Sequence, residues 1–297
     1  MRSRISLYLL LALLFYVTTF LFTLDTWVLG IFQVGVLGLA WTVAWRGTRR
    51  FADLPAKPLL LITAAAVLWI SLQLALGTTV YSKVTVDLLL YWVTALCLIF
   101  LGAQLGQSRS DARLLLKAMV WFTVVMAMIG VLSFYTAGGK YYWLIPSEYP
   151  FVVGPFAYRN YFAILVELIL PITLYFAFRE RRNWAFYAAA VAIMYGTVLA
   201  TGSRSGTGLL TVELLVLLFL IPTRGLSRGK GFGSVFARVL LLIAAFTVIS
   251  GYELILQRFQ MEDPYVTRRE FLLSAIEMVK DRPLWGFGLG TWTIAYP

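Results

Sequence analysis

The sequence predicts an all-α integral membrane protein with about nine transmembrane helices and an amphipathic external helix near the C-terminus. Hydrophobic residues make up 61% of the 297 residues and charged residues only 13%, and the mean hydropathy is +0.83. A chain this apolar cannot bury its surface in one soluble core, so lipid must act as its solvent.

Apolar stretches of bilayer-spanning length define the expected helices. A helix needs roughly 17 to 25 residues to cross a bilayer. Such stretches lie near residues 5–23, 26–45, 58–76, 84–105, 115–135, 160–178, 184–201, 207–222 and 235–251. The first stretch has no small-residue cleavage site after it, which favours a retained helix over a signal peptide. Residues 1–251 therefore form one polytopic transmembrane domain, and residues 252–297 begin a large external loop.

The basic residues predict the orientation of these helices. The net charge is +11, but the charges lie in short clusters between apolar stretches, which argues against a nucleic-acid partner. With a cytoplasmic N-terminus, sixteen of the 25 basic residues lie on inner segments, the four outer loops between helices hold only Lys83, Lys140, Arg159 and Arg204, and the remaining five follow the ninth helix. The positive-inside rule favours this orientation and places residues 136–159 and 252–297 outside.

Three acidic residues, Asp87, Glu167 and Glu213, lie within or at the edge of the predicted helices. A charge in lipid is costly unless it faces a cavity or a partner. In the predicted orientation all three lie toward the outer side, so they are expected to surround one outward-facing polar cavity. Arg159 and Arg204, at outer helix ends, are expected to pair with these acids or with an anionic ligand. Structural ion pairs that lock helices together are the alternative.

Two short motifs contain these arginines. GPFAYRNYFA (residues 154–163) leads into the sixth helix, with Asn160 as the expected N-cap and Arg159 adding positive charge to a helix start that favours anions. A plain helix cap is the alternative for this motif.

TGSRSG (residues 201–206) places Arg204 between the hydroxyls of Ser203 and Ser205. Arginine among hydroxyls and exposed amides favours a phosphate partner. Snorkelling of Arg204 to the membrane surface is the alternative.

A third motif opens the predicted external loop. Thr267-Arg268-Arg269-Glu270 fits a capping box, with Thr267 as the N-cap. Apolar residues recur at helical spacing after it, so an amphipathic helix is expected to lie on the outer leaflet. The helix is expected to stop at Asp281-Arg282-Pro283, and the GFGLG sequence that follows permits tight turns.

Together, the three motifs resemble those of the O-antigen ligase and O-antigen polymerase superfamily, bacterial membrane glycosyltransferases of lipopolysaccharide and polysaccharide biosynthesis. The resemblance covers roughly residues 150–297, and TRREFLLSAIEMVKDRPLWGFGLGTW carries most of its specificity. It implies transfer of a glycan from undecaprenyl diphosphate to an acceptor hydroxyl of lipid A core, of a growing polysaccharide or of a protein. It also implies a bacterial inner-membrane location, a periplasmic active face, and no metal or other cofactor.

The resemblance also implies roles for particular residues. By position, Arg204 and Arg268 correspond to the two catalytic arginines of the family, and Arg269 is the fallback for the second. Bidentate guanidinium groups suit a leaving diphosphate, which gains charge as the sugar bond breaks. The residues expected to bind the diphosphate or line the cavity are Arg159, Asn160, Ser203, Ser205, Arg269, Glu167 and Glu213.

The sequence departs from the family pattern in its catalytic base. The resemblance implies a histidine in the large loop that activates the acceptor, but the sequence contains no histidine. The chain is therefore expected to be truncated within this loop and inactive by itself. A transporter or flippase of a lipid-linked or anionic solute is the main alternative function, because intramembrane charges also mark permeation paths. A non-catalytic membrane scaffold is the third.

Overall fold

The computed structural model describes residues 2–20, 26–46, 54, 56–146, 156, 158–180, 182–220 and 266–295. The chain forms two compact units. The first unit comprises Met1–Leu13, Leu29–Ala112 and Met261–Pro297, and the second comprises Leu14–Val28 and Arg113–Gln260.

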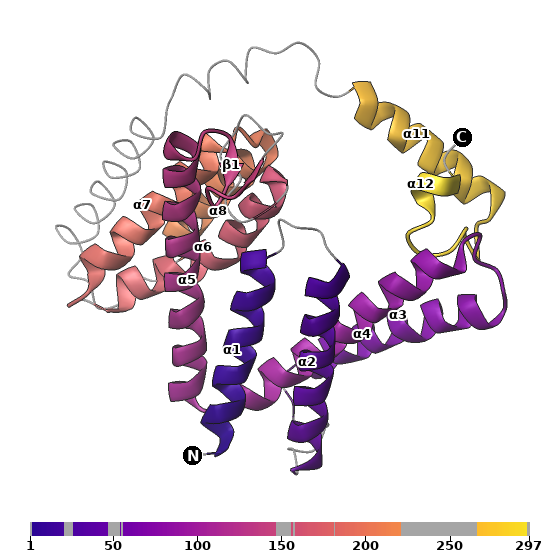
Figure 1. The fold of residues 1–297 in the computed structure, drawn as a ribbon, viewed down its shortest axis with the longest axis horizontal. Helices are drawn as coiled ribbons and strands as arrows, with labels where there is room; N and C mark the ends of the chain where they lie inside the picture. Colours follow the sequence, from indigo (N-terminus) through magenta and orange to yellow (C-terminus); the bar gives the residue numbers. More distant parts are fainter. Residues whose placement is uncertain are drawn as a thin grey trace. The chain divides into compact units, whose positions relative to one another are not determined.

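Most of the described residues are helical (Figure 1). The helices are α1 (Arg2–Phe20), α2 (Thr26–Trp45), α3 (Lys57–Ala75), α4 (Ser82–Leu105), α5 (Arg109–Thr136), α6 (Arg159–Arg179), α7 (Trp184–Ala200), α8 (Arg204–Leu220), α11 (Val266–Asp281) and α12 (Trp292–Ala295). Strands β1 (Lys140–Tyr141) and β2 (Ile145–Pro146) form a small antiparallel hairpin that the sequence did not predict.

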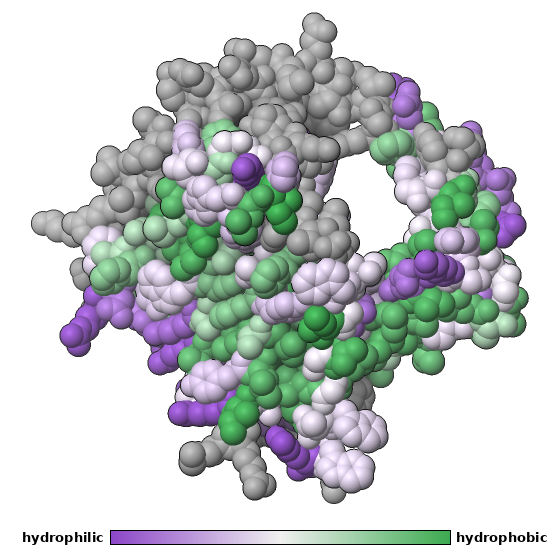
Figure 2. Space-filling view, in the orientation of Figure 1, coloured by the Kyte–Doolittle hydropathy of each residue, from purple (hydrophilic) through white to green (hydrophobic). Residues whose placement is uncertain are grey.

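Eight of the nine predicted spans coincide with described helices. Helices α2 to α6 are long and apolar enough to cross a membrane, and α1, α7 and α8 contain shorter apolar stretches. Only 17% of the apolar stretch of α4 is buried, and Figure 2 shows apolar side chains along the visible faces of α3 and α4. Such faces require lipid, so the protein is an all-α, multi-pass membrane protein. The predicted ninth span, residues 235–251, lies outside the described residues.

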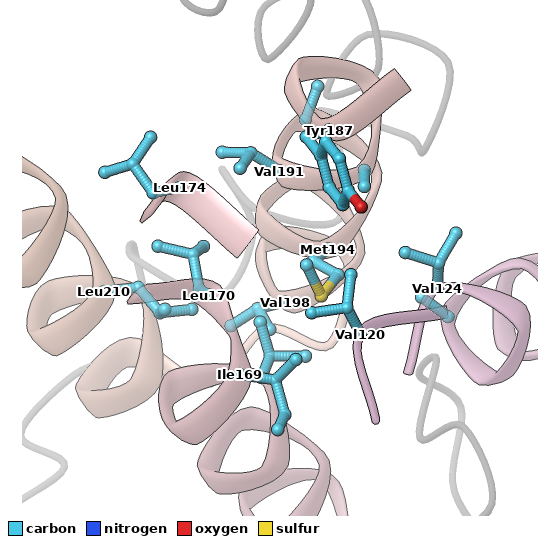
Figure 3. Close-up of a cluster of buried hydrophobic side chains, with 14 of the residues drawn as sticks. Val120, Val124, Ile169, Leu170, Leu174, Tyr187, Val191, Met194, Val198 and Leu210 are labelled. Carbon is cyan, nitrogen blue, oxygen red and sulfur yellow. The ribbon is translucent and has the colours of Figure 1, made fainter. Parts of the chain in front are cut away.

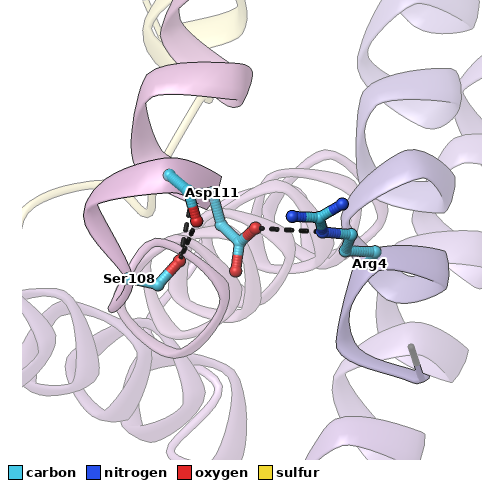
Figure 4. A network of polar contacts seen from close by, with 4 residues as sticks. Arg4, Ser108 and Asp111 are labelled. Atoms are coloured by element: carbon cyan, nitrogen blue, oxygen red, sulfur yellow. Dashed lines mark hydrogen bonds and ion pairs between the residues drawn. The ribbon is translucent and has the colours of Figure 1, made fainter.

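Polar contacts and aromatic residues mark helix ends in the first unit. Ser108 caps α5 by accepting a hydrogen bond from the backbone N–H of Asp111 at 3.0 Å, and Arg4 Nε lies 3.7 Å from Asp111 Oδ1 (Figure 4). The start of α1 and the start of α5 therefore lie at the same end. At the last turn of α2, Trp41 and Trp45 stack and are strongly exposed, as expected for an aromatic belt at a membrane interface.

The glycine-rich segment 285–291 sits on the turn between α3 and α4, within the first unit. The side-chain amide of Gln73 donates to the Trp285 carbonyl at 2.7 Å, and the backbone N–H of Val80 donates to the Phe287 carbonyl at 2.8 Å. Trp285 also stacks on Trp69 at 5.2 Å. This segment and the α3–α4 turn therefore lie on one side of the membrane, as the alternation of predicted spans requires.

Helices α5 to α8 build the core of the second unit (Figure 3). Leu170 and Leu174 of α6, Val191, Met194 and other residues of α7, and Leu210 of α8 are fully or almost fully buried. Helix α7 is rich in alanine, so its backbone can approach the neighbouring helices closely. Such close packing stabilises helix contacts in a membrane, because lipid provides no hydrophobic driving force between helices.

Contacts in the second unit also reproduce the expected alternation. Lys117 Nζ, in the first half of α5, forms an ion pair with Glu180 Oε1 at 2.7 Å just after the end of α6. At the opposite end of α6, its first turn contacts the residue before α8. The ends of α6 therefore lie at opposite sides of the bundle, and which side faces the cytoplasm remains a prediction from the charges.

A labelling experiment tests this orientation. Ser205 and Arg182 are both exposed and lie near opposite ends of α7. In a Cys97→Ser background, we expect Ser205→Cys to react with a membrane-impermeant maleimide in intact cells. Arg182→Cys should react only after the membrane is permeabilised, because the positive-inside rule places it in the cytoplasm. The reverse pattern would show that the orientation is inverted.

Candidate functional site

The first and second sequence motifs contact each other in the second unit. Ser203 Oγ donates a hydrogen bond to Asn160 Oδ1 at 2.9 Å, across a separation of 43 residues, and we call this contact the joint. Ser203 is 3% exposed and Thr201, in the same turn, is fully buried. The joint thus ties the beginning of α6 to the beginning of α8. The sequence predicted that both motifs are functional but not that they touch.

The capping roles differ from those predicted. Helix α6 begins at Arg159, its N-cap residue is Tyr158 without a side-chain capping bond, and Asn160 lies in the first turn. Ser203 is the residue that caps, because its Oγ accepts a hydrogen bond from the backbone N–H of Gly206 at 3.2 Å. Arg204 was predicted in a loop, but its backbone begins α8. The local sequence is compatible with a start of α6 at either position. Asn160 does not cap the helix, because packing against α8 engages its side chain with Ser203 instead.

Gly206 allows α6 and α8 to approach closely at this joint. A Cβ atom at Gly206 would lie 2.6 Å from Cβ of Ala163 and 3.0 Å from Ser203 Oγ. The sequence signal was available, since small residues on two helices permit close backbone contact in membranes. It was missed because the partner helix of α8 was unknown.

Two glycines of α8 should respond to alanine with opposite signs. Gly206→Ala should destabilise the protein by about 1 to 3 kcal/mol, as overpacking does. A Cβ atom added at Gly208 would have no neighbouring atom within 4 Å, so Gly208→Ala should stabilise by up to about 1 kcal/mol through helix propensity alone. Thermal unfolding in detergent measures both. Equal effects of the two substitutions would contradict the close approach at Gly206.

Two of the acidic residues that were predicted to line a cavity lie on adjacent helices of this unit. Glu167 is on α6 and Glu213 on α8, and they are close enough to interact electrostatically. Oε2 of Glu213 is buried and has no hydrogen-bond partner among the described residues. The ion pairs Arg4–Asp111 and Lys117–Glu180 involve other acids. The expected pairing of Glu167 or Glu213 with Arg159 or Arg204 therefore stays a prediction.

Asp87 belongs to the first unit, on α4 one turn before Tyr91. Glu167 and Glu213 belong to the second unit, so a cavity that all three acids surround also stays a prediction.

The joint brings two helix N-termini to one end of the bundle. Helices α6 and α8 both begin there, and each starts with an arginine, Arg159 and Arg204. The N-terminus of a helix carries a partial positive charge and N–H groups without intrahelical partners. Two such ends with two arginines favour an anion such as a phosphate. Ser205 is exposed beside them.

The third motif belongs to the first unit. Helix α11 begins at Val266, so Thr267 lies in its first turn rather than at the N-cap, a shift that is ordinary for helix boundaries. Arg269 is exposed, and Leu272, Ile276 and Val279 form an exposed apolar stripe, as predicted for a helix on a membrane surface. The side chains of Arg204 and Arg268 lie outside the described part of the structure.

These observations define a multi-pass helical membrane protein in whose second unit two helix N-termini meet at the joint. Residues 188–297 match the family model described as O-antigen ligase. The match supports the O-antigen ligase and polymerase superfamily as the family of this chain. It includes the TGSRSG motif and the α11 segment but begins after the GPFAYRNYFA motif. No curated protein and no solved structure matches the chain.

Proposed function

We propose that the protein transfers a glycan from undecaprenyl diphosphate to an acceptor hydroxyl at the outer face of the bacterial inner membrane. The observation that carries this proposal is the family match over residues 188–297, which contains both Arg204 and Arg268. The joint between α6 and α8 supports it, because two helices begin there, each with an arginine, and helix N-termini favour anions.

The chemistry explains why positive charge is needed. The acceptor oxygen bonds to the anomeric carbon of the glycan while the bond from that carbon to the diphosphate oxygen breaks. The carrier leaves with the bonding electron pair, so negative charge grows on its terminal phosphate. Arg204 and Arg268 stabilise this charge by two-point hydrogen bonding. Arg159, Ser205 and Arg269 are the further residues proposed to bind the diphosphate.

The acceptor proton requires a base. The family resemblance assigns this role to a histidine, and these 297 residues contain none. We therefore expect a polypeptide that ends at Pro297 to bind the carrier lipid without transferring the glycan. Robust transfer by that polypeptide would show that another group, such as Glu270 or Glu277, accepts the proton.

The experiment is a transfer assay with the full-length gene product in proteoliposomes. The donor is an undecaprenyl diphosphate-linked glycan, and separate reactions contain lipid A core or a second donor glycan as acceptor. We expect product with one acceptor and no loss of activity with a chelator. Movement of the labelled donor between leaflets without transfer would instead favour the transporter alternative, which the family match does not favour. Absence of both activities would leave the scaffold alternative.

A further inference from the structure

The hydroxyl of Ser203 is engaged on two sides. Its only proton is donated to Asn160 Oδ1 at 2.9 Å, and its oxygen accepts the backbone N–H of Gly206 at 3.2 Å. The backbone N–H of Ser203 donates to Thr201 Oγ1 at 3.2 Å. Ser203 is almost completely buried. A serine in this arrangement has no proton left to donate to a phosphate oxygen.

From this arrangement we infer that Asn160 and Ser203 are positioning residues for the first turn of α8 rather than ligands of the diphosphate. The inference rests on the proposed function and revises two residues that the sequence placed in the binding set. Asn160 holds Ser203 from α6, and Ser203 holds the first turn of α8 through Gly206. Arg204 lies between the two residues of that turn, so the Asn160–Ser203 bond sets where its backbone begins.

The close approach of the helices makes this bond decisive for the start of α8. Gly206 lies against Ala163, one turn after Asn160 on α6. After that contact, toward their C-terminal ends, the two helices are held by packing. Before it, toward their N-terminal ends, the Asn160–Ser203 hydrogen bond links α6 to the start of α8. Without the bond, the turn that begins with Arg204 is free to shift, and a displacement of about 1 Å in a catalytic group costs about a hundredfold in rate.

Substitutions of Asn160 distinguish a role in positioning the first turn of α8 from a role in binding the diphosphate. Asn160→Asp keeps an oxygen that accepts the Ser203 proton, whereas Asn160→Leu removes it at similar size. A positioning role predicts that Asn160→Asp keeps near-normal transfer, while Asn160→Leu lowers kcat by up to about a hundredfold with little change in the donor KM. A ligand role predicts the opposite order, because an aspartate repels a diphosphate and would raise the donor KM more than leucine does.

A double-mutant cycle tests whether the two residues act as a unit. Ser203→Ala should lower kcat at least as much as Asn160→Leu, because it also removes the cap on Gly206, and the double variant should be no worse than Ser203→Ala alone. Asn183 provides a matched control, because it is exposed, lies before α7 and makes no side-chain capping bond. Asn183→Asp and Asn183→Leu should leave transfer unchanged.

The outcomes are distinguishable from failure of the proposed function. All transfer assays use the full-length gene product, and if its wild-type form transfers no glycan with any acceptor, the proposed function fails and the positioning role fails with it. A thermal-unfolding cycle on the same variants would still report the Asn160–Ser203 coupling in that case. If the wild type transfers but Asn160→Asp is as inactive as Asn160→Leu, or if the single effects add in the double variant, the positioning role alone is overturned.

Discussion

Arg204→Lys and Arg268→Lys should each lower glycan transfer by the full-length gene product by roughly a hundredfold to a thousandfold, although both substitutions retain the positive charge. Loss of one preorganised contact to developing charge costs about 2.7 to 4 kcal/mol in the transition state. A lysine ammonium is a point charge and cannot reproduce the planar, two-point grip of a guanidinium on a diphosphate.

The measurement is the initial rate of transfer from an undecaprenyl diphosphate donor, in membranes with matched expression of each variant. Arg182→Lys is the control, because Arg182 is exposed in the turn between α6 and α7 and should be insensitive to the change. Near-normal rates for both lysine variants would show that the diphosphate is held by other residues. Arg159 and Arg269 would then be the next arginines to replace.

Gly288→Ala should release the segment 285–291 from the α3–α4 turn. Gly288 has a φ of +102°, and a Cβ there would overlap the side chain of Thr79. Backbone strain costs roughly 1 to 3 kcal/mol and overpacking about 1 to 3 kcal/mol. The sum is comparable to the whole stability of a local element, so the hydrogen bonds from Gln73 and Val80 should open.

Hydrogen exchange at the Val80 amide measures this release, because that N–H bonds to the Phe287 carbonyl. Gly286→Ala is the matched control: its φ is also positive, at +63°, but nothing lies within 4 Å of an added Cβ. Gly286→Ala should therefore accelerate exchange only as far as backbone strain does. If Gly286→Ala and Gly288→Ala accelerate exchange equally, steric contact with Thr79 does not hold the segment.

The release would also affect α11. The segment follows α11 directly in the chain, and Phe271 of α11 packs edge-to-face on Trp292 of α12 at 5.1 Å. The segment is thus the described attachment of α11 to the membrane-spanning hairpin. Because Arg268 lies in the first turn of α11, we expect Gly288→Ala to reduce transfer as well, through loss of this attachment.

The sequence by itself determined the class of the protein and the positions of most of its helices. Apolar stretches near residues 26–45 and 84–105 became α2 and α4 within two residues at each end, because the length of a membrane span is a local property that bilayer thickness imposes. The motifs also pointed to the family that residues 188–297 match, because they are short, contiguous patterns.

Only the tertiary structure decided which of these patterns meet. Asn160 engages Ser203 across 43 residues, and Gln73 engages the Trp285 carbonyl across 212. No local pattern encodes such pairs, since they depend on which helices pack together and on how closely small residues such as Gly206 and Ala163 let them approach. For the same reason the sequence assigned Asn160 to a helix cap and Ser203 to a phosphate, whereas packing between α6 and α8 bonds these two side chains to each other.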